Sequence, residues 1–229
     1  MKTPRLRKKT LISFLNWQEI ITWGQNHYRD RAFKQNEPIP IRAGLLYLVQ
    51  CGAVSLTGNI RANILSQKNN PEEAKETFLG LMGTGYPFEI TKNPHFTFKA
   101  SAQVDSTVVL WMYWHDLDNW PNFRLEVLDF FRDRHQRQLL WLTVLGQQRT
   151  IDRLWGFLTL LIEEYGNAVD KRICFPYPLT HLQISSAIGS TRVTVTRLMG
   201  KLRQQGLISV ETDSTICLLD RIPSHYDFL

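Results

Sequence analysis

The segment 190–203, STRVTVTRLMGKLR, combines residue types that could recognise another molecule. At about 100° of rotation per residue, it is expected to form a helix with one apolar stripe facing a core. That stripe consists of Val195, Leu198, Met199 and Leu202. Val193 and Arg197 face the opposite direction, and Arg192 projects from the first turn. An aliphatic side chain between two guanidinium groups is unusual on a face that meets only water.

This outward face fits the edges of base pairs in the major groove of double-stranded DNA. Arginine offers paired donors to O6 and N7 of guanine, and a small apolar group can contact the methyl group of thymine. We therefore expect Arg192, Val193 and Arg197 to read bases. The residues expected to hold phosphates and set the register are Thr180, Ser190, Thr191, Thr194 and Lys201. Alternatively, the arginines are solvated surface charges and Val193 is a single exposed apolar residue.

Local signals indicate how this helix would be presented. Thr180 and Gln183 match a capping box, in which the threonine hydroxyl accepts from the Gln183 amide and the glutamine side chain reaches back. Gly189 suits a tight turn between two helices because glycine tolerates a positive φ. Ser190 or Thr191 can then cap the second helix. A first helix over 179–188 is thus expected to lead directly into the basic one.

The chain on either side of these helices adds further elements. The alternating runs LISVET and TICLLD flank residues 213–214 and predict a hairpin. Helix, turn, helix and hairpin in this order predict a winged helix-turn-helix. Another helix is expected over 151–165, with Gly166 as a left-handed stop.

The amino-terminal half has a different sequence pattern. Its short apolar runs lie between glycines and prolines, at 45–50, 53–60, 77–82, 96–104 and 107–112. This spacing predicts an antiparallel sandwich or barrel. The run TLISFLNWQEIITW before it predicts a short amphipathic helix, because polar residues interrupt it. Residues 66–76 are expected to form a solvent-facing hairpin loop.

A long helix is predicted between the two halves. It would start near Pro121, and residues 122–148 contain no proline and only Gly146 as a glycine. Spacings of three and four form a heptad seam of Leu128, Phe131, His135, Gln138, Leu142 and Leu145. The seam indicates either a helix packed on its own barrel or the contact of a symmetric dimer, in which the polar members would fix the register.

Composition narrows the class of protein. The 229 residues carry a formal charge of +6, and 179–210 contains basic residues but no Asp or Glu, which favours a polyanionic partner. The basic tail 2–9 is expected to be a solvated terminus. Cys51, Cys174 and Cys217 lack zinc or iron–sulfur spacing, so no metal site is predicted, and they suit buried thiols in a reducing cytoplasm. No apolar run has the length of a membrane span, so we expect a cytoplasmic protein without a membrane partner.

Residues 179–209, LTHLQISSAIGSTRVTVTRLMGKLRQQGLIS, resemble the DNA-binding motif of the cAMP receptor protein/FNR superfamily. Within them, IGSTRVTVTRL is similar to the recognition helix of its cyanobacterial nitrogen-regulator subgroup, and LLYLVQCGAVSL resembles the superfamily's strand–glycine–strand segment. The resemblance implies an α+β fold in three parts. These are a β-roll like that of cyclic-nucleotide-binding domains over 1–118, a dimerisation helix over 119–148 and a winged helix-turn-helix over 149–229.

The resemblance also implies a mode of action. A homodimer would bind a palindrome with Arg192 and Arg197 as base readers, its half-sites ~34 Å apart, and contact RNA polymerase when bound. Readers of the cyclic-AMP-receptor type commonly carry glutamate where Val193 stands. The nitrogen-regulator subgroup instead has sites resembling GTA–spacer–TAC, which is the class expected here. No enzymatic activity is implied.

The effector end of the resemblance departs from the superfamily pattern. Glu89 matches the ribose-binding glutamate, but Phe88 replaces the preceding glycine, and no arginine lies between Arg61 and Arg124 to hold a cyclic phosphate. Cyclic AMP is therefore not expected. For 2-oxoglutarate, Arg134 corresponds to the long-helix arginine, whereas the β-roll arginine is missing. Arg134 and Glu89 remain the candidate effector residues, and a dimer that needs no effector stays open.

Two other classes of function are weighed against this one. In the first, the winged helix serves a ligand- or protein-binding module that does not read DNA sequence, and the two arginines would then matter little. In the second, the β-roll is a metal-dependent enzyme. That enzyme would need clustered ligands on inward-facing strand positions, where the strand region offers only His95.

Overall fold

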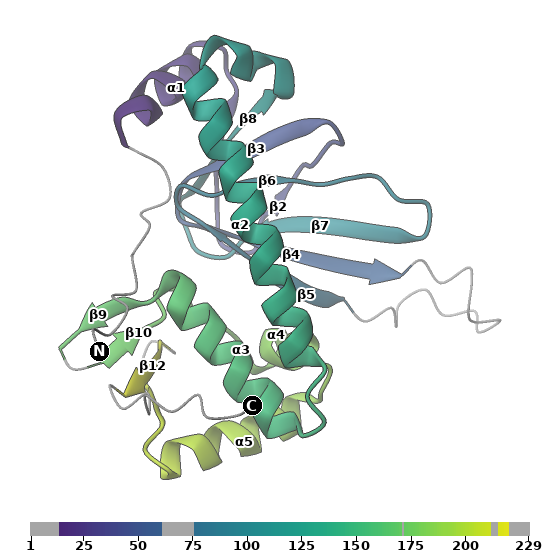
Figure 1. Ribbon diagram of the computed structural model, residues 1–229, viewed down its shortest axis with the longest axis vertical. Coiled ribbons are helices and arrows are strands. Elements are labelled where there is room, and N and C mark those ends of the chain that lie inside the picture. Colours follow the sequence, from purple (N-terminus) through teal and green to yellow (C-terminus); the bar gives the residue numbers. More distant parts are fainter. Residues whose placement is uncertain (1–13, 61–75, 171, 212–214, 220–229) are drawn as a thin grey trace, which may run out of the picture.

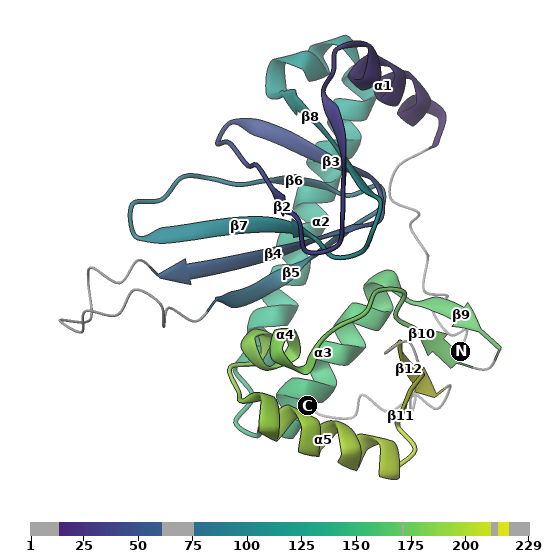
Figure 2. The same cartoon turned by 180° about the vertical axis from the view of Figure 1, so that it is seen from behind.

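A computed structural model describes residues 14–60, 76–170, 172–211 and 215–219 of the chain. The basic tail, nearly all of the 66–76 loop and the 213–214 turn lie outside the described residues. The fold is α+β, with a β-roll at one end, a winged helix-turn-helix at the other and the long helix α2 running beside both (Figures 1 and 2). No described helix has both the length and the apolar character needed to cross a membrane.

The β-roll consists of two antiparallel four-stranded sheets, ordered β1-β8-β3-β6 and β2-β7-β4-β5. The strands are β1 (Asp30–Phe33), β2 (Pro38–Ile39), β3 (Leu45–Cys51), β4 (Ala53–Ile60), β5 (Thr77–Gly83), β6 (Pro87–Glu89), β7 (Phe96–Ala102) and β8 (Thr107–Tyr113). All five predicted strands are confirmed. The short strands β1, β2 and β6 were not predicted, because two to four residues show too little alternation to be recognised.

Two helical elements cover the β-roll. Helix α1 (Phe14–Asn26) packs Trp17 and Ile20 against the sheet, and a 3-10 helix, η3 (Trp114–Asn119), leads from β8 into α2 (Pro121–Leu145). Pro121 is the first residue of α2, where its missing N–H leaves no hydrogen bond unmade. The first half of α2 buries Phe123, Val127 and Phe130 against the roll. Its second half continues to the carboxyl-terminal helices.

The carboxyl-terminal part follows the predicted layout. Its helices are α3 (Thr150–Tyr165), α4 (His181–Ala187) and α5 (Arg192–Gln204). A sheet of order β11-β12-β10-β9 packs beside them, built from β9 (Asn167–Val169), β10 (Arg172–Cys174), β11 (Ile208–Val210) and β12 (Ile216–Leu219). The hairpin β11–β12 is the wing. The helices and the wing share one core, which includes Phe157, Ile184 and Val195.

Two local expectations are wrong. Cys174 and Cys217 form a disulfide instead of two thiols, because β10 and β12 pair with these residues directly opposite each other. Cys51 is exposed at the end of β3, not buried. Gly166 has a φ of −60° and a ψ of 137°, so it is extended instead of left-handed. The chain passes straight from α3 into β9 at this point, which requires extended backbone.

Candidate nucleic-acid interface

The turn between α4 and α5 has the predicted local structure. The Thr180 hydroxyl accepts from the Gln183 amide at 3.1 Å, and the Thr180 amide donates to Gln183 Oε1 at 2.9 Å, which completes the capping box. Gly189 has a φ of +61°. Of the two possible caps of α5, Thr191 is the one observed, and its hydroxyl accepts from the Thr194 amide at 3.1 Å. The entry of α5 is therefore held by local hydrogen bonds.

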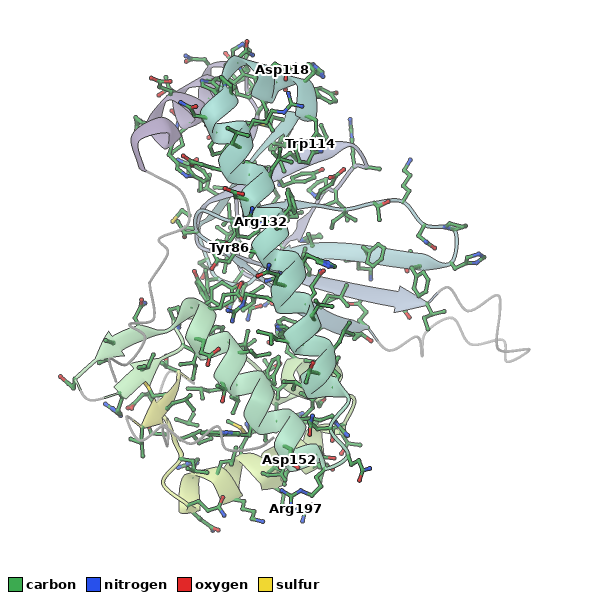
Figure 3. The ribbon with its side chains drawn as sticks, viewed as in Figure 1. Tyr86, Trp114, Asp118, Arg132, Asp152 and Arg197 are labelled. Atoms are coloured by element: carbon green, nitrogen blue, oxygen red, sulfur yellow. A yellow bond between two sulfur atoms is a disulfide. The ribbon has the colours of Figure 1, made fainter. Side chains whose placement is uncertain are left out.

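Helix α5 divides into a buried and an exposed face as its sequence predicts. Its buried side chains are Val195, Leu198, Met199 and Leu202. Val193 is 79% exposed, and Arg192, Arg197 and Lys201 are exposed as well. Among the described residues, these three cations form no ion pair and no side-chain hydrogen bond. Figure 3 shows Arg197 at the outer edge of the molecule, beyond α5. No described residue covers this face, which could therefore meet a large partner.

The predicted phosphate-holding hydroxyls are already used within the motif. The Thr191 hydroxyl donates to Thr194 Oγ1 at 2.9 Å, and the Thr180 hydroxyl lies 3.1 Å from Gln183 Oε1. Both threonines at the helix caps remain exposed, whereas Ser190 and Thr194 are half-buried. These hydroxyls therefore act first as caps. The amino terminus of α5 and the Lys201 ammonium group stay accessible to an anion.

Two contacts that hold the interface were not predicted. Arg153 of α3 donates from Nε to the Ile188 carbonyl at 3.0 Å and from Nη1 to the Gln147 carbonyl at 2.9 Å. It thereby ties the end of α4 to the loop after α2. His181 Nδ1 lies 2.8 Å from Thr196 Oγ1, which joins the start of α4 to the middle of α5. None of these contacts has a sequence signal, because the partners lie beyond the spacing of three or four residues that neighbouring helix turns bring together.

The predicted seam of α2 is largely uncovered. Leu128 is 48% exposed and Leu142 is 64% exposed, and Leu145, His135 and Gln138 are exposed too. Phe131 is the exception, since it is half-buried near Trp114. Further exposed leucines of α2 are Leu125, Leu139 and Leu140. The leucines of the seam thus stay exposed within the described part of the chain, whereas Phe131, His135 and Gln138 border the space between α2 and the β-roll.

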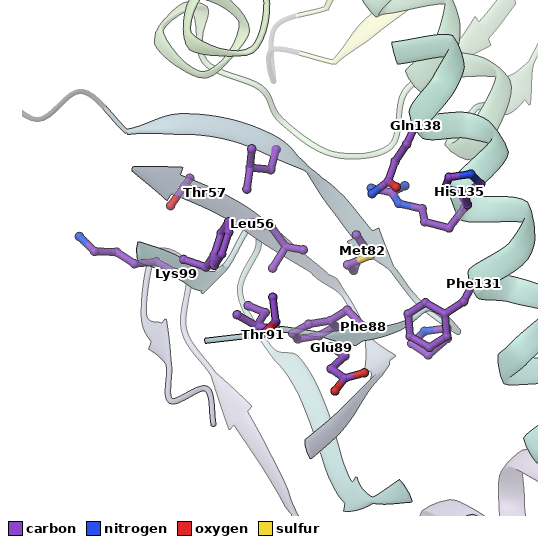
Figure 4. Close-up of a pocket in the computed structure, with 15 residues that line it drawn as sticks. Leu56, Thr57, Met82, Phe88, Glu89, Thr91, Lys99, Phe131, His135 and Gln138 are labelled. Atoms are coloured by element: carbon purple, nitrogen blue, oxygen red, sulfur yellow. The ribbon is translucent and has the colours of Figure 1, made fainter. Parts of the chain in front are cut away.

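A hollow of about 280 Å³ lies between the β-roll and α2 (Figure 4). Its apolar lining consists of Leu56, Leu79, Met82, Pro87, Phe88, Ile90, Phe98 and Phe131. Both candidate effector residues line it. Glu89 accepts a hydrogen bond from Trp114 Nε1 at 3.2 Å, and Arg134 forms an ion pair with Glu164 at 3.0 Å. Lys99, also in the lining, is paired with Glu76.

Residues 152–222 match the model of the Crp-like helix-turn-helix domain. The carboxyl-terminal part of the chain therefore contains a Crp-like helix-turn-helix domain.

Two curated proteins are similar to part of the chain. The global nitrogen regulator of Synechocystis sp. is 36% identical over 90 residues, which is 39% of this chain and 40% of that protein. The global nitrogen regulator of Synechococcus elongatus is 47% identical over 58 residues, which is 25% of this chain and 26% of that protein. The chain thus matches less than half of the length of these relatives.

Solved structures match over more of the chain. A CooA mutant from Carboxydothermus hydrogenoformans has a TM-score of 0.62 and 22% identity, covering 84% of this chain and 83% of that one. A cyclic nucleotide-binding domain containing protein from Listeria monocytogenes has a TM-score of 0.68 and 13% identity, covering 90% and 98%. At these identities the likeness shows the fold.

Proposed function

We propose that the chain is a sequence-specific regulator of transcription that binds double-stranded DNA as a homodimer. The observation that carries the proposal is the face of α5. Arg192, Val193 and Arg197 are exposed there, and the two guanidinium groups have no partner among the described residues. A buried or internally paired arginine could not donate to a base, whereas these two can. The regulator would act in the cytoplasm and contact RNA polymerase.

The exposed leucines of α2 supply the dimer contact in this proposal. A stripe that contains Leu128 and Leu142 would otherwise stay in water, and its burial against the same stripe of a second copy is favourable. The twofold axis would then relate two α5 helices. Two recognition helices read successive major grooves when they lie about one helical turn, ~34 Å, apart.

The class of binding site follows from the side chains on α5. Each arginine can read a guanine, and Val193 can contact a thymine methyl but cannot accept from cytosine. We propose a palindrome of the GTA–spacer–TAC class, which the resemblance of IGSTRVTVTRL to the nitrogen-regulator recognition helix implies. Selection of bound DNA from a random pool tests this, run with and without 2-oxoglutarate. We expect the same palindrome in both arms, and enrichment of no palindrome would refute the proposal.

The hollow beside α2 supports a regulator that does not depend on an anionic effector. Of the cations in its lining, Arg134 is paired with Glu164 and Lys99 with Glu76. A carboxylate or phosphate entering the hollow would have to displace an internal carboxylate first. We therefore propose that neither cyclic AMP nor 2-oxoglutarate is required for DNA binding.

The affinity for operator DNA is predicted to fall steeply with salt. Each phosphate that a cation neutralises releases condensed counterion, so log K declines linearly with log salt concentration. If each protomer neutralises three or more phosphates, we expect a loss of roughly 1000-fold between 50 and 200 mM salt. Fluorescence anisotropy with a labelled operator measures this slope. A flat profile would favour a module that does not bind DNA.

Gly200 is predicted to make α5 less stable than alanine would, and to allow the backbone of α5 to approach DNA closely. Gly200 lies two turns after Val193 on nearly the same side of the helix, ~10 Å farther along its axis. A helix that enters a major groove ~12 Å wide would contact the wall of the groove at about this distance. A Cβ at this position would contact nothing in the described chain, so packing does not require glycine. We expect Gly200→Ala to stabilise the protein by up to about 1 kcal/mol and to weaken operator binding several-fold.

Thermal unfolding and anisotropy titration together test this effect. Thr22→Ala is the matched control, because it also raises helix propensity at an exposed position, but on α1, far from α5. The control variant should keep the operator affinity of the wild type. Unchanged operator binding by Gly200→Ala would show that the backbone of α5 does not approach DNA at this residue.

A further inference from the structure

A buried ion cluster joins the long helix to the DNA-binding part. The side chain of Glu164, the second-last residue of α3, is 6% exposed. One of its oxygens accepts from Arg134 Nη1 at 3.0 Å and the other from Arg137 Nε at 2.9 Å. Arg137 also donates from Nη2 to the Leu160 carbonyl at 2.7 Å. Each carboxylate oxygen thus holds a different arginine of α2.

The same cluster touches the β-roll. A Cβ on Gly80 of β5 would lie 2.8 Å from Arg134 Nη2, so the guanidinium group lies directly over the strand. Tyr165, next to Glu164, donates its hydroxyl to the Leu81 carbonyl at 2.5 Å. Burial alone would lower the pKa of Arg134, but Tyr165 and Glu164 hold it above its ordinary value, so the cation persists. The helices α2 and α3 and the strand β5 therefore meet at this ion cluster.

Such a cluster specifies geometry more than it adds stability. Apolar helix faces can slide or rotate against each other at small cost, whereas a buried carboxylate loses its partners when the helices shift by a fraction of a turn. Helix α5 is coupled to α3 through a shared core, which contains Phe157 and Val195. The angle between α2 and α3 therefore contributes to the direction of α5, together with the contact of α4 with β5, where Ser186 Oγ accepts from the Phe78 amide at 3.1 Å.

We propose that Glu164 is a positioning residue that sets the orientation of the winged helix-turn-helix relative to α2. In the dimer, it would thereby determine which spacing of half-sites the two recognition helices fit. This inference rests on the proposed function. Glu164 also gives the Arg134 cation an internal carboxylate partner. Without Glu164, Arg134 would be a free cation in the wall of the hollow.

The test uses the full-length variant Glu164→Ala, which leaves a carboxylate-sized gap between two guanidinium groups. Affinity is measured on operators whose half-sites are moved apart or together by one and two base pairs. We expect at least a tenfold loss on the best wild-type spacing and a flatter dependence on spacing. Formate or acetate should restore both, and acetamide, which has the shape of acetate but no charge, should not.

A second readout is independent of DNA. Formate that fills the gap should raise the Tm of Glu164→Ala but not that of the wild type. The change in Tm tests the role of Glu164 without DNA. The proposed function is tested separately, because it fails if the wild type binds no palindrome at all. Glu37→Ala is the control, since it removes a carboxylate paired with Arg31 away from the cluster.

Several outcomes would overturn the proposal. Wild-type spacing preference in Glu164→Ala would do so, and so would a lost affinity that no carboxylate restores. If Glu164→Ala does not fold, Glu164→Gln, which keeps the side-chain volume and removes the charge, is measured on the same operator series. A Gln variant with the spacing preference of the wild type, or one that also fails to fold, would show that Glu164 serves only stability.

Discussion

Replacing Arg197 with alanine is expected to remove sequence-specific DNA binding while the protein stays folded. A bidentate contact of arginine to guanine contributes roughly 1–3 kcal/mol of discrimination. A dimer makes this contact twice, so the affinity for the operator should fall at least about 30-fold. Anisotropy titration on operator and scrambled duplexes measures the loss. Arg192→Ala should behave in the same way.

The stability of these variants should not change, because neither guanidinium group has a partner among the described residues. Arg31→Ala is the matched control, since it removes the same charge from an exposed position on the β-roll. The control should keep the ratio between operator and scrambled affinities. If Arg192→Ala and Arg197→Ala also kept that ratio, α5 would not be the reader of bases.

Leu142→Glu is expected to convert the dimer into a monomer. Leu142 is 64% exposed and lies in the stripe proposed to meet its own copy, so the substitution places like charges close together at a twofold interface. A dimer also binds its second half-site at a high effective concentration, and loss of that advantage reduces affinity by a factor on the order of 100 or more. Sedimentation and operator titration measure the two effects.

Tyr28→Glu provides the control for this experiment. Tyr28 is 90% exposed and follows α1, which lies at the opposite end of α2 from Leu142, so the substitution introduces the same charge away from Leu142. That variant should remain dimeric and bind the operator normally. A Leu142→Glu protein that sedimented as a dimer would place the interface elsewhere and leave the exposed leucines of α2 unexplained.

Signals that act within a few residues were sufficient to predict most of the DNA-binding motif. The capping box at Thr180, the turn at Gly189 and the buried stripe through Val195 depend on spacings of three or four residues, so the order of residues determines them. The outward direction of Arg197 follows from the same periodicity. The five longer strands of the β-roll were recognisable for a similar reason, because each has enough residues to alternate or to form an apolar run.

The tertiary structure alone decided which distant residues meet. The sequence made Arg134 a candidate for holding an effector. In the fold, α3 packs against α2 and brings Glu164, which is 30 residues further along the chain, into contact with Arg134. The disulfide between Cys174 and Cys217 depends on the register of β10 and β12, which no spacing in the sequence encodes. Periodicity describes one element at a time, whereas pairing across elements depends on how their faces pack. The sequence by itself therefore determined the surface that would read DNA, and the packing of α2, α3 and β5 decided how that surface is held.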